Sequence, residues 1–301
     1  MTRTLRSAFL SLFAVGMAAS LSGCKVDCEP GDDSVQCIGQ STVQYIGTPI
    51  VRQVAWTDGQ RLTVGIVGGN IRTGETASTS ITINPHSTGG KPAECSDATQ
   101  VCVRFLPINN DTKDRKDEAT RQMKQVAEGG NLLTNVGSDA NGVVVTVDLD
   151  NRNGKYNSSL SAIADIWIPD NFNGDIVAKS ESGGISVRGA RRGATVETGL
   201  GDIAFDLVSV IPTTTDNTIT TRNGDIIFSV PRSANLNIQG QVSGAGDKVL
   251  IDTVTGWQEV EGSTEQSATF CGNAACSGQS EGLWKLNATS LGSIQIKLLL
   301  A

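Results

Sequence analysis

Three aspartates that each follow a glycine, Asp175, Asp202 and Asp225, have the type and spacing that could support acid–base chemistry. If the strands around them stack, their carboxylates form a row, and glycoside hydrolysis needs two carboxylates within about 10 Å of each other. Aspartate also suits turns, because it tolerates the left-handed conformation and bonds its own backbone. The turn role is the simpler interpretation, so we predict no catalytic residues and no enzymatic activity.

Metal and base chemistry have little support in the remaining residues. The single histidine, His86, lies in "NPHSTGG" and is predicted to be a loop residue rather than a general base. The stretch "DLDNRNG" begins like a calcium loop with Asp148 and Asp150, but Arg152 stands where the third ligand should be. We predict no metal and no cofactor, and calcium binding at Asp148 and Asp150 stays open.

The first 24 residues have the three parts of an export signal. Arg3 and Arg6 form a basic region, and an apolar run too short to span a bilayer follows them. "LSGC", ending at Cys24, resembles the lipobox of bacterial lipoproteins, in which the signal is cut before a cysteine that then carries lipid. This resemblance implies that residues 1–23 are removed and that Cys24 anchors the protein to a membrane without a spanning helix.

The other six cysteines fall into three close pairs, Cys28 with Cys37, Cys95 with Cys102, and Cys271 with Cys276. An even number of cysteines in an exported chain favours disulfides, because the compartment is oxidising. Six cysteines allow fifteen connectivities, so the sequence alone leaves the connectivity open, and close spacing favours local pairing. Zinc sites usually combine CxxC spacing with several histidines, which this chain lacks.

The charge balance argues against nucleic acid as a partner. The formal net charge is −7, and removal of the basic signal makes it more negative. The densest basic stretch, "RGARR", holds Arg188, Arg191 and Arg192 among acidic residues. We interpret it as solvated turns between strands rather than a binding stripe.

Short β runs separated by glycine and asparagine make up most of the chain, which predicts an all-β fold. Residues 24–40, rich in Asp, Gly and Pro, are predicted to be a flexible tether, and residues 41–301 a single β-repeat domain. The charged stretch 111–128 is the exception. Its apolar residues Ala119, Met123 and Val126 share one helical face, so we expect a short surface helix there.

A period of nine residues runs through the stretch 173–205, with an alternating apolar and polar pattern inside it. Glycines precede the strand starts and are expected at tight turns, where a side chain is not tolerated. These turn glycines are Gly174, Gly183, Gly201 and Gly224. The apolar residues predicted to form one buried, stacked ladder are Ile176, Ile185, Ile203 and Ile226, while Lys179, Arg188 and Asp206 should be exposed.

Such a repeat favours a stack of strands that share a continuous core and have covered ends. The predicted fold is a solenoid-like stack of short repeated strands resembling a right-handed β-helix. A meandering sandwich with hairpins at the Asn-Gly pairs is the alternative.

The stretches "GDIVAKSESGGISVRG", "GATVETGLGDIAF", "TTRNGDIIFSVPRSANLNIQGQVSG" and "ATSLGSIQIKL" resemble the "putative adhesin" family, also called Toastrack, a domain of unknown function. The similarity is strongest over residues 166–301. The resemblance implies a β-stranded, solenoid-like domain on bacterial envelope proteins, and it brings no catalytic residues. The helical insertion and the added cysteine pairs depart from the family's pattern.

Together these features predict an envelope lipoprotein with a structural or binding role. We expect it at the outer membrane, on its periplasmic or surface face, with a protein or polysaccharide ligand and no nucleic acid. The alternatives are an accessory or scaffold protein for other membrane proteins and a polysaccharide-acting enzyme. A binding protein should expose an apolar strip on a sheet face, whereas an enzyme should have a cleft with convergent carboxylates.

Overall fold

The computed structural model describes residues 42–67, 79–112, 116–128, 134–149, 160–213, 217–251 and 255–299. The chain divides into two units, residues 1–40 and 41–301, and every described residue belongs to the second. The predicted signal peptide, the tether, Cys24, the Cys28 and Cys37 pair and Asp150 lie outside the described residues.

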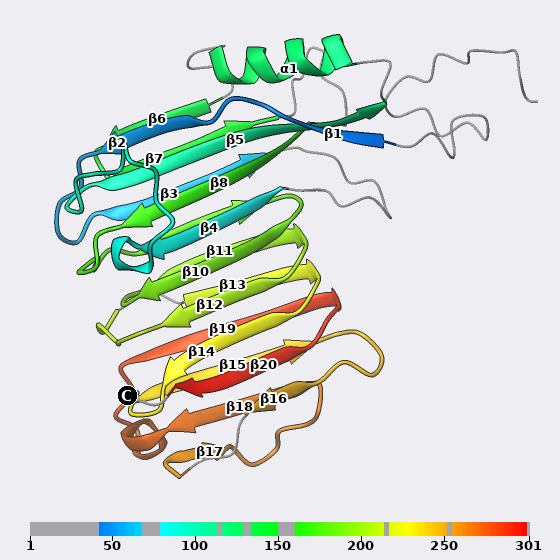
Figure 1. The fold of residues 1–301 in the computed structure, drawn as a ribbon. Coiled ribbons are helices and arrows are strands. Elements are labelled where there is room, and N and C mark those ends of the chain that lie inside the picture. The colour runs from blue at the N-terminus through cyan, green and yellow to red at the C-terminus, as the bar shows by residue number, and fades with distance from the viewer. Residues whose placement is uncertain are drawn as a thin grey trace, which may run out of the picture. The chain divides into compact units, whose positions relative to one another are not determined.

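Two large sheets form the second unit (Figure 1). The first sheet contains, in spatial order, β1 (Thr42–Ile46), β5 (Val101–Thr112), β8 (Leu160–Ile168), β4 (Ser80–Pro85), β10 (Gly184–Ala190), β12 (Ile203–Leu207), β14 (Ile226–Pro231), β20 (Ile294–Leu299) and β16 (Val249–Ile251), with β2 (Ile50–Val54) also paired to β5. The second contains β17 (Trp257–Glu259), β18 (Ser267–Gly272), β15 (Leu236–Val242), β19 (Gly282–Leu291), β13 (Asn217–Asn223), β11 (Ala194–Leu200), β9 (Ile176–Ser180), β3 (Arg61–Val67), β7 (Gly142–Asp148) and β6 (Thr134–Asp139).

Consecutive strands alternate between the two sheets through the repeat region. β9 and β11 lie in the second sheet and β10 and β12 in the first, and each pairs in parallel with the strand two places along the chain. One coil therefore consists of one strand from each sheet. The inward side chains of both sheets meet in one continuous apolar core, which confirms the all-β, solenoid-like prediction.

All four predicted ladder residues are buried, but they do not form one ladder. Ile185, Ile203 and Ile226 are in register in the first sheet. Ile176 lies in the second sheet, where it pairs with Ala194, so its assignment to the same ladder is wrong. Nine residues advance the chain by one strand and into the opposite sheet, and only a full coil returns it to the same sheet.

The turn glycines are required by the close stacking of successive coils. Gly183, Gly201 and Gly224 all have positive φ values, of 97°, 130° and 148°. A Cβ on Gly224 would overlap the backbone of Gly201, and a Cβ on Gly201 would overlap that of Gly183. A Cβ on Gly174 would overlap the carbonyl oxygen of Gln60. Substitution at these turns must therefore push neighbouring coils apart.

Antiparallel strands cover both ends of the stack. At one end β5 runs antiparallel to β8, with β1 and β2 beyond it, and at the other β18 and β17 continue the second sheet. The helix α1 (Lys116–Glu128) lies at the first end and packs on β5 (Figure 1), with Ala119 and Met123 buried. It begins five residues later than predicted, because β5 continues to Thr112 in pairing with β1. No helix in the described ranges is long and apolar enough to cross a membrane.

Candidate functional site

The glycine-following aspartates do not form the single row that acid–base chemistry would need. Asp175 precedes a strand of the second sheet, whereas Asp202 and Asp225 precede strands of the first, so they lie at opposite edges of the coil. Asp202 Oδ1 accepts a hydrogen bond from the Asp225 amide at 2.8 Å. Asp225 Oδ1 accepts one from the Ser293 amide at 2.7 Å. These carboxylates join the turns of successive coils, which agrees with the structural interpretation.

The basic stretch at 188–192 belongs to the opposite edge of the coil. Arg191 and Arg192 form the turn between β10 and β11, and Arg188 is exposed on β10. Arg191 Nη2 donates to the carbonyl oxygen of Asp170 at 3.0 Å, and Arg192 Nε lies 3.3 Å from Asp175 Oδ1. Both turn arginines therefore contact neighbouring turns of the stack.

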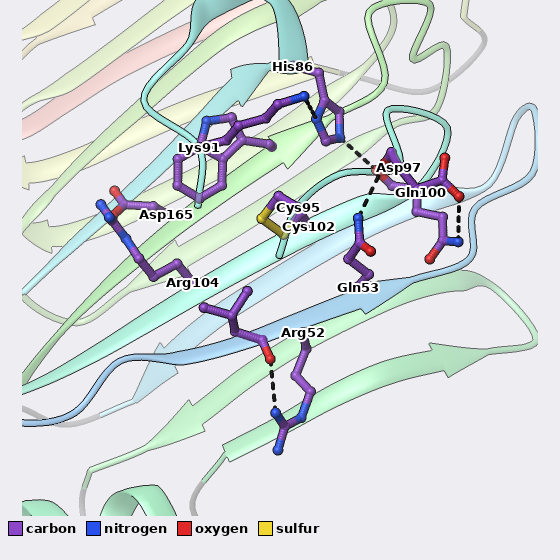
Figure 2. Close-up of a disulfide and its surroundings, with 12 residues drawn as sticks. Arg52, Gln53, His86, Lys91, Cys95, Asp97, Gln100, Cys102, Arg104 and Asp165 are labelled. Carbon is purple, nitrogen blue, oxygen red and sulfur yellow. Dashed lines mark hydrogen bonds and ion pairs between the residues drawn. A yellow bond between two sulfur atoms is a disulfide. The ribbon is translucent and has the colours of Figure 1, made fainter. Parts of the chain in front are cut away.

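A loop on the outer face of the first sheet is the part of the described structure where charged, aromatic and sulfur groups gather away from the repeat (Figure 2). We call residues 86–100, which join β4 to β5, the disulfide loop. Cys95 in this loop is bonded to Cys102 in β5, and both are buried with Trp167 of β8 in a cluster separate from the main core. Cys102 stands between Val101 and Val103, which point into the main core, so alternation places it on the outer face.

His86 fastens the two ends of the disulfide loop together. It lies in the short helix η1 (His86–Thr88) and is only 4% exposed. Its Nε2 is 2.8 Å from the carbonyl oxygen of Gln100, so Nε2 carries the proton and donates. The Nδ1 atom then accepts from Lys91 Nζ at 3.4 Å. Because both ring nitrogens are engaged, the predicted loop role fits this residue better than that of a general base.

Two aspartates brace the same loop through its backbone. Asp97 accepts hydrogen bonds from the Thr99 hydroxyl at 2.6 Å and the Thr99 amide at 2.9 Å. These two bonds, the hydroxyl bond most strongly, lower the pKa of Asp97. Asp170, from the turn after β8, accepts from the Ser87 amide at 2.9 Å, and this bond lowers the pKa of Asp170. Both carboxylates are therefore held in the charged form that the loop requires.

Beside the disulfide loop, Arg104 and Asp165 form an ion pair across β5 and β8 (Figure 2). Arg104 Nε donates to Asp165 Oδ2 at 3.0 Å, and the guanidinium carbon lies 5.5 Å from the centre of the Trp167 ring. Trp167 Nε1 in turn donates to the Gly89 carbonyl at 3.3 Å. Sequence reasoning missed this group, because only the antiparallel register of β5 and β8 places Arg104 opposite Asp165.

The second described disulfide joins Cys271 to Cys276, so two of the three predicted pairs form. The tryptophans do not form an exposed binding strip. Trp167, Trp257 and Trp284 are all less than 9% exposed, and Trp56 is partly buried against the main core.

These elements define the class of fold, a two-sheet β-solenoid with covered ends. A solved structure described as a "putative cell adhesion protein" from Clostridium sporogenes is similar to it, with a TM-score of 0.52. The match covers 84% of this chain and 99% of the other, at 12% sequence identity. At that identity the likeness shows the fold alone. No protein-family model matches the chain, and no curated protein matches it.

Proposed function

We propose that this protein is a non-catalytic binding protein of the bacterial cell envelope, anchored by lipid on Cys24, that presents its solenoid to a partner. The observation that carries the proposal is the bracing of the disulfide loop. His86 joins its two ends, the Cys95–Cys102 bond ties its interior to β5, and the segment 87–90 is exposed. Binding residues are often placed on loops held by a rigid scaffold, and prior ordering lowers the entropy cost of binding.

The aspartates and the histidine that could have taken part in catalysis have structural roles in the fold, which supports a non-catalytic function. Asp202 and Asp225 bond the backbone of neighbouring turns, and His86 bonds the two ends of its own loop. Asp202 and Asp225 therefore stabilise the stack, whereas His86 stabilises the disulfide loop. The Clostridium sporogenes structure is described as a "putative cell adhesion protein", which agrees with a binding role.

Binding can be tested with a soluble form, residues 25–301, which lacks the signal and the lipid-accepting Cys24, on arrays of bacterial polysaccharides and extracellular proteins. We expect saturable binding that weakens at least tenfold in the double variant Thr88→Ala/Glu94→Ala, which changes two exposed side chains of the disulfide loop. The matched control is Lys179→Ala, an exposed residue on the outer face of the second sheet, which should bind as the parent does. Equal binding by the loop variant, or shortening of a bound polysaccharide, would refute the proposal.

The anchor requires a separate test in cells that express the full chain. The parent should fractionate with membranes, and Cys24→Ala should give unprocessed or soluble protein, because the lipid acceptor is lost. Protease added to intact cells then distinguishes the periplasmic face from the surface. Membrane partitioning of Cys24→Ala equal to that of the parent would show that the lipid anchor is wrong.

A further inference from the structure

The two described disulfides differ in their exposure to solvent. Cys95 and Cys102 are both 0% exposed beneath the disulfide loop. Cys271 is 8% exposed, and its partner Cys276 lies on the surface in the short helix η4 (Asn273–Ser277). Thiol–disulfide exchange requires a thiolate to reach a disulfide sulfur. The exposed Cys271–Cys276 bond should therefore react with external thiols more readily than the buried Cys95–Cys102 bond.

We propose that the Cys271–Cys276 bond is a thiol–disulfide exchange site, whose substrates are thiols able to reach the surface of the protein. An incoming thiolate attacks Cys276 Sγ, the sulfur–sulfur bond breaks, and Cys271 Sγ leaves as a thiolate. The product carries a mixed disulfide on Cys276. A second external thiolate then attacks that mixed disulfide, which releases an external disulfide and leaves both cysteines reduced. The two external thiols supply the two electrons.

The positions of the two cysteines determine which sulfur is attacked. Cys271 lies within β18, with Asn237 of β15 on one side and Gln258 of β17 on the other. Neighbouring strands therefore flank Cys271 on both sides. Cys276 lies in η4 outside the sheet and is exposed. The attack consequently falls on Cys276, and Cys271 is the leaving group.

The helix η4 has enough other contacts to stay in place when the bond opens. The Asn273 side chain donates to the carbonyl oxygens of Arg232 and Ala234, each at 2.9 Å. Asn235 Oδ1 accepts from the Ala274 amide at 3.1 Å. Ala275 is buried against the sheet. Because these contacts remain after reduction, the two thiols stay near each other and the bond can form again.

Loop size does not distinguish the two disulfides, because the sequence separation is five for Cys271–Cys276 and seven for Cys95–Cys102. Each bond closes a short loop, so the two should stabilise the fold by similar amounts. The exposure of Cys276 is therefore the feature that favours reversible chemistry at the Cys271–Cys276 bond.

The mature folded protein, treated with increasing concentrations of reduced glutathione, tests the proposal. Samples are quenched with acid and alkylated, and the peptides are read by mass spectrometry. We expect labelling of Cys271 and Cys276, with the glutathione adduct on Cys276, at thiol concentrations at least tenfold below those that open Cys95–Cys102. The buried disulfide is the internal control, and an unchanged circular dichroism spectrum shows that the fold persists.

A second arm identifies the kind of thiol. A dithiol protein of the CxxC type, with its resolving cysteine replaced by serine, should be trapped as a mixed disulfide on Cys276 if protein thiols are substrates as well as small ones. Its failure alongside a glutathione adduct restricts the substrates to small thiols. Simultaneous opening of both described disulfides, or an adduct on Cys271, would overturn the proposal. The outcome is independent of ligand binding by the disulfide loop.

Discussion

Truncation of Ile185 to alanine tests the stacked core most directly. Ile185 is 1% exposed and sits in β10 between Ile81 of β4 and Ile203 of β12, both fully buried. The change removes three carbon atoms, which at about 0.8 kcal/mol each gives roughly 2.4 kcal/mol of lost transfer energy. Strands hydrogen-bonded on both sides keep the backbone from closing the space. A cavity penalty therefore adds to the loss, and we expect about 3–4 kcal/mol in total.

The matched control is Arg188→Ala in the same strand. Arg188 is exposed and points away from the core, so its loss should change the free energy of unfolding by no more than about 0.5 kcal/mol. Urea unfolding of both variants, followed by circular dichroism, gives the two values. Equal losses would refute the assignment of the two faces of β10, since a slip of one residue moves every side chain to the opposite face.

Three further predictions concern a turn glycine, an ionised aspartate and a disulfide. Gly224→Ala should cost more than about 3 kcal/mol, because its Cβ would overlap the backbone of the preceding coil, whereas Gly278→Ala, with positive φ but open space, should cost about 1–2 kcal/mol in urea unfolding. Asp170 has a lowered pKa in the folded state, so its stabilisation is present above the unfolded value of about 3.8 and is lost as pH falls through the folded value. The difference in unfolding free energy between the parent and Asp170→Asn should therefore shrink between pH 5 and pH 3, and a constant difference would contradict the assignment. Peptide mapping without reduction should find Cys28 linked to Cys37, and a disulfide from either of them to a cysteine of another pair would rule out local pairing.

Much of the fold follows from local patterns that need no knowledge of distant residues. Alternation within a strand decides which side chains are buried, so Ile185 and Ile203 were predictable as core residues. Gly201 and Gly224 indicate turns in the sequence, because residues other than glycine rarely adopt the positive φ values found there. Close spacing favours a local disulfide such as Cys95–Cys102, because a short loop brings the sulfur atoms together.

The candidate site depended on contacts that sequence spacing does not encode. Arg104 meets Asp165 only because β5 pairs with β8 in one antiparallel register, although the two residues lie 61 positions apart. His86 is buried only because the loop folds back on the outer face, where a lone histidine gives no signal of its own.

The sequence by itself determined the strand period, the inward side chains and the turn glycines, since each depends on the conformation of a few neighbouring residues. Only the tertiary structure decided that Ile176 and Ile185 belong to opposite sheets, and that Asp175 is separated from Asp202 by the width of a coil. A nine-residue period is compatible with neighbouring strands in one sheet or with alternation between two. The packing of both sheets around one shared core selects the second arrangement, because there the apolar face of every coil is covered by the opposite sheet.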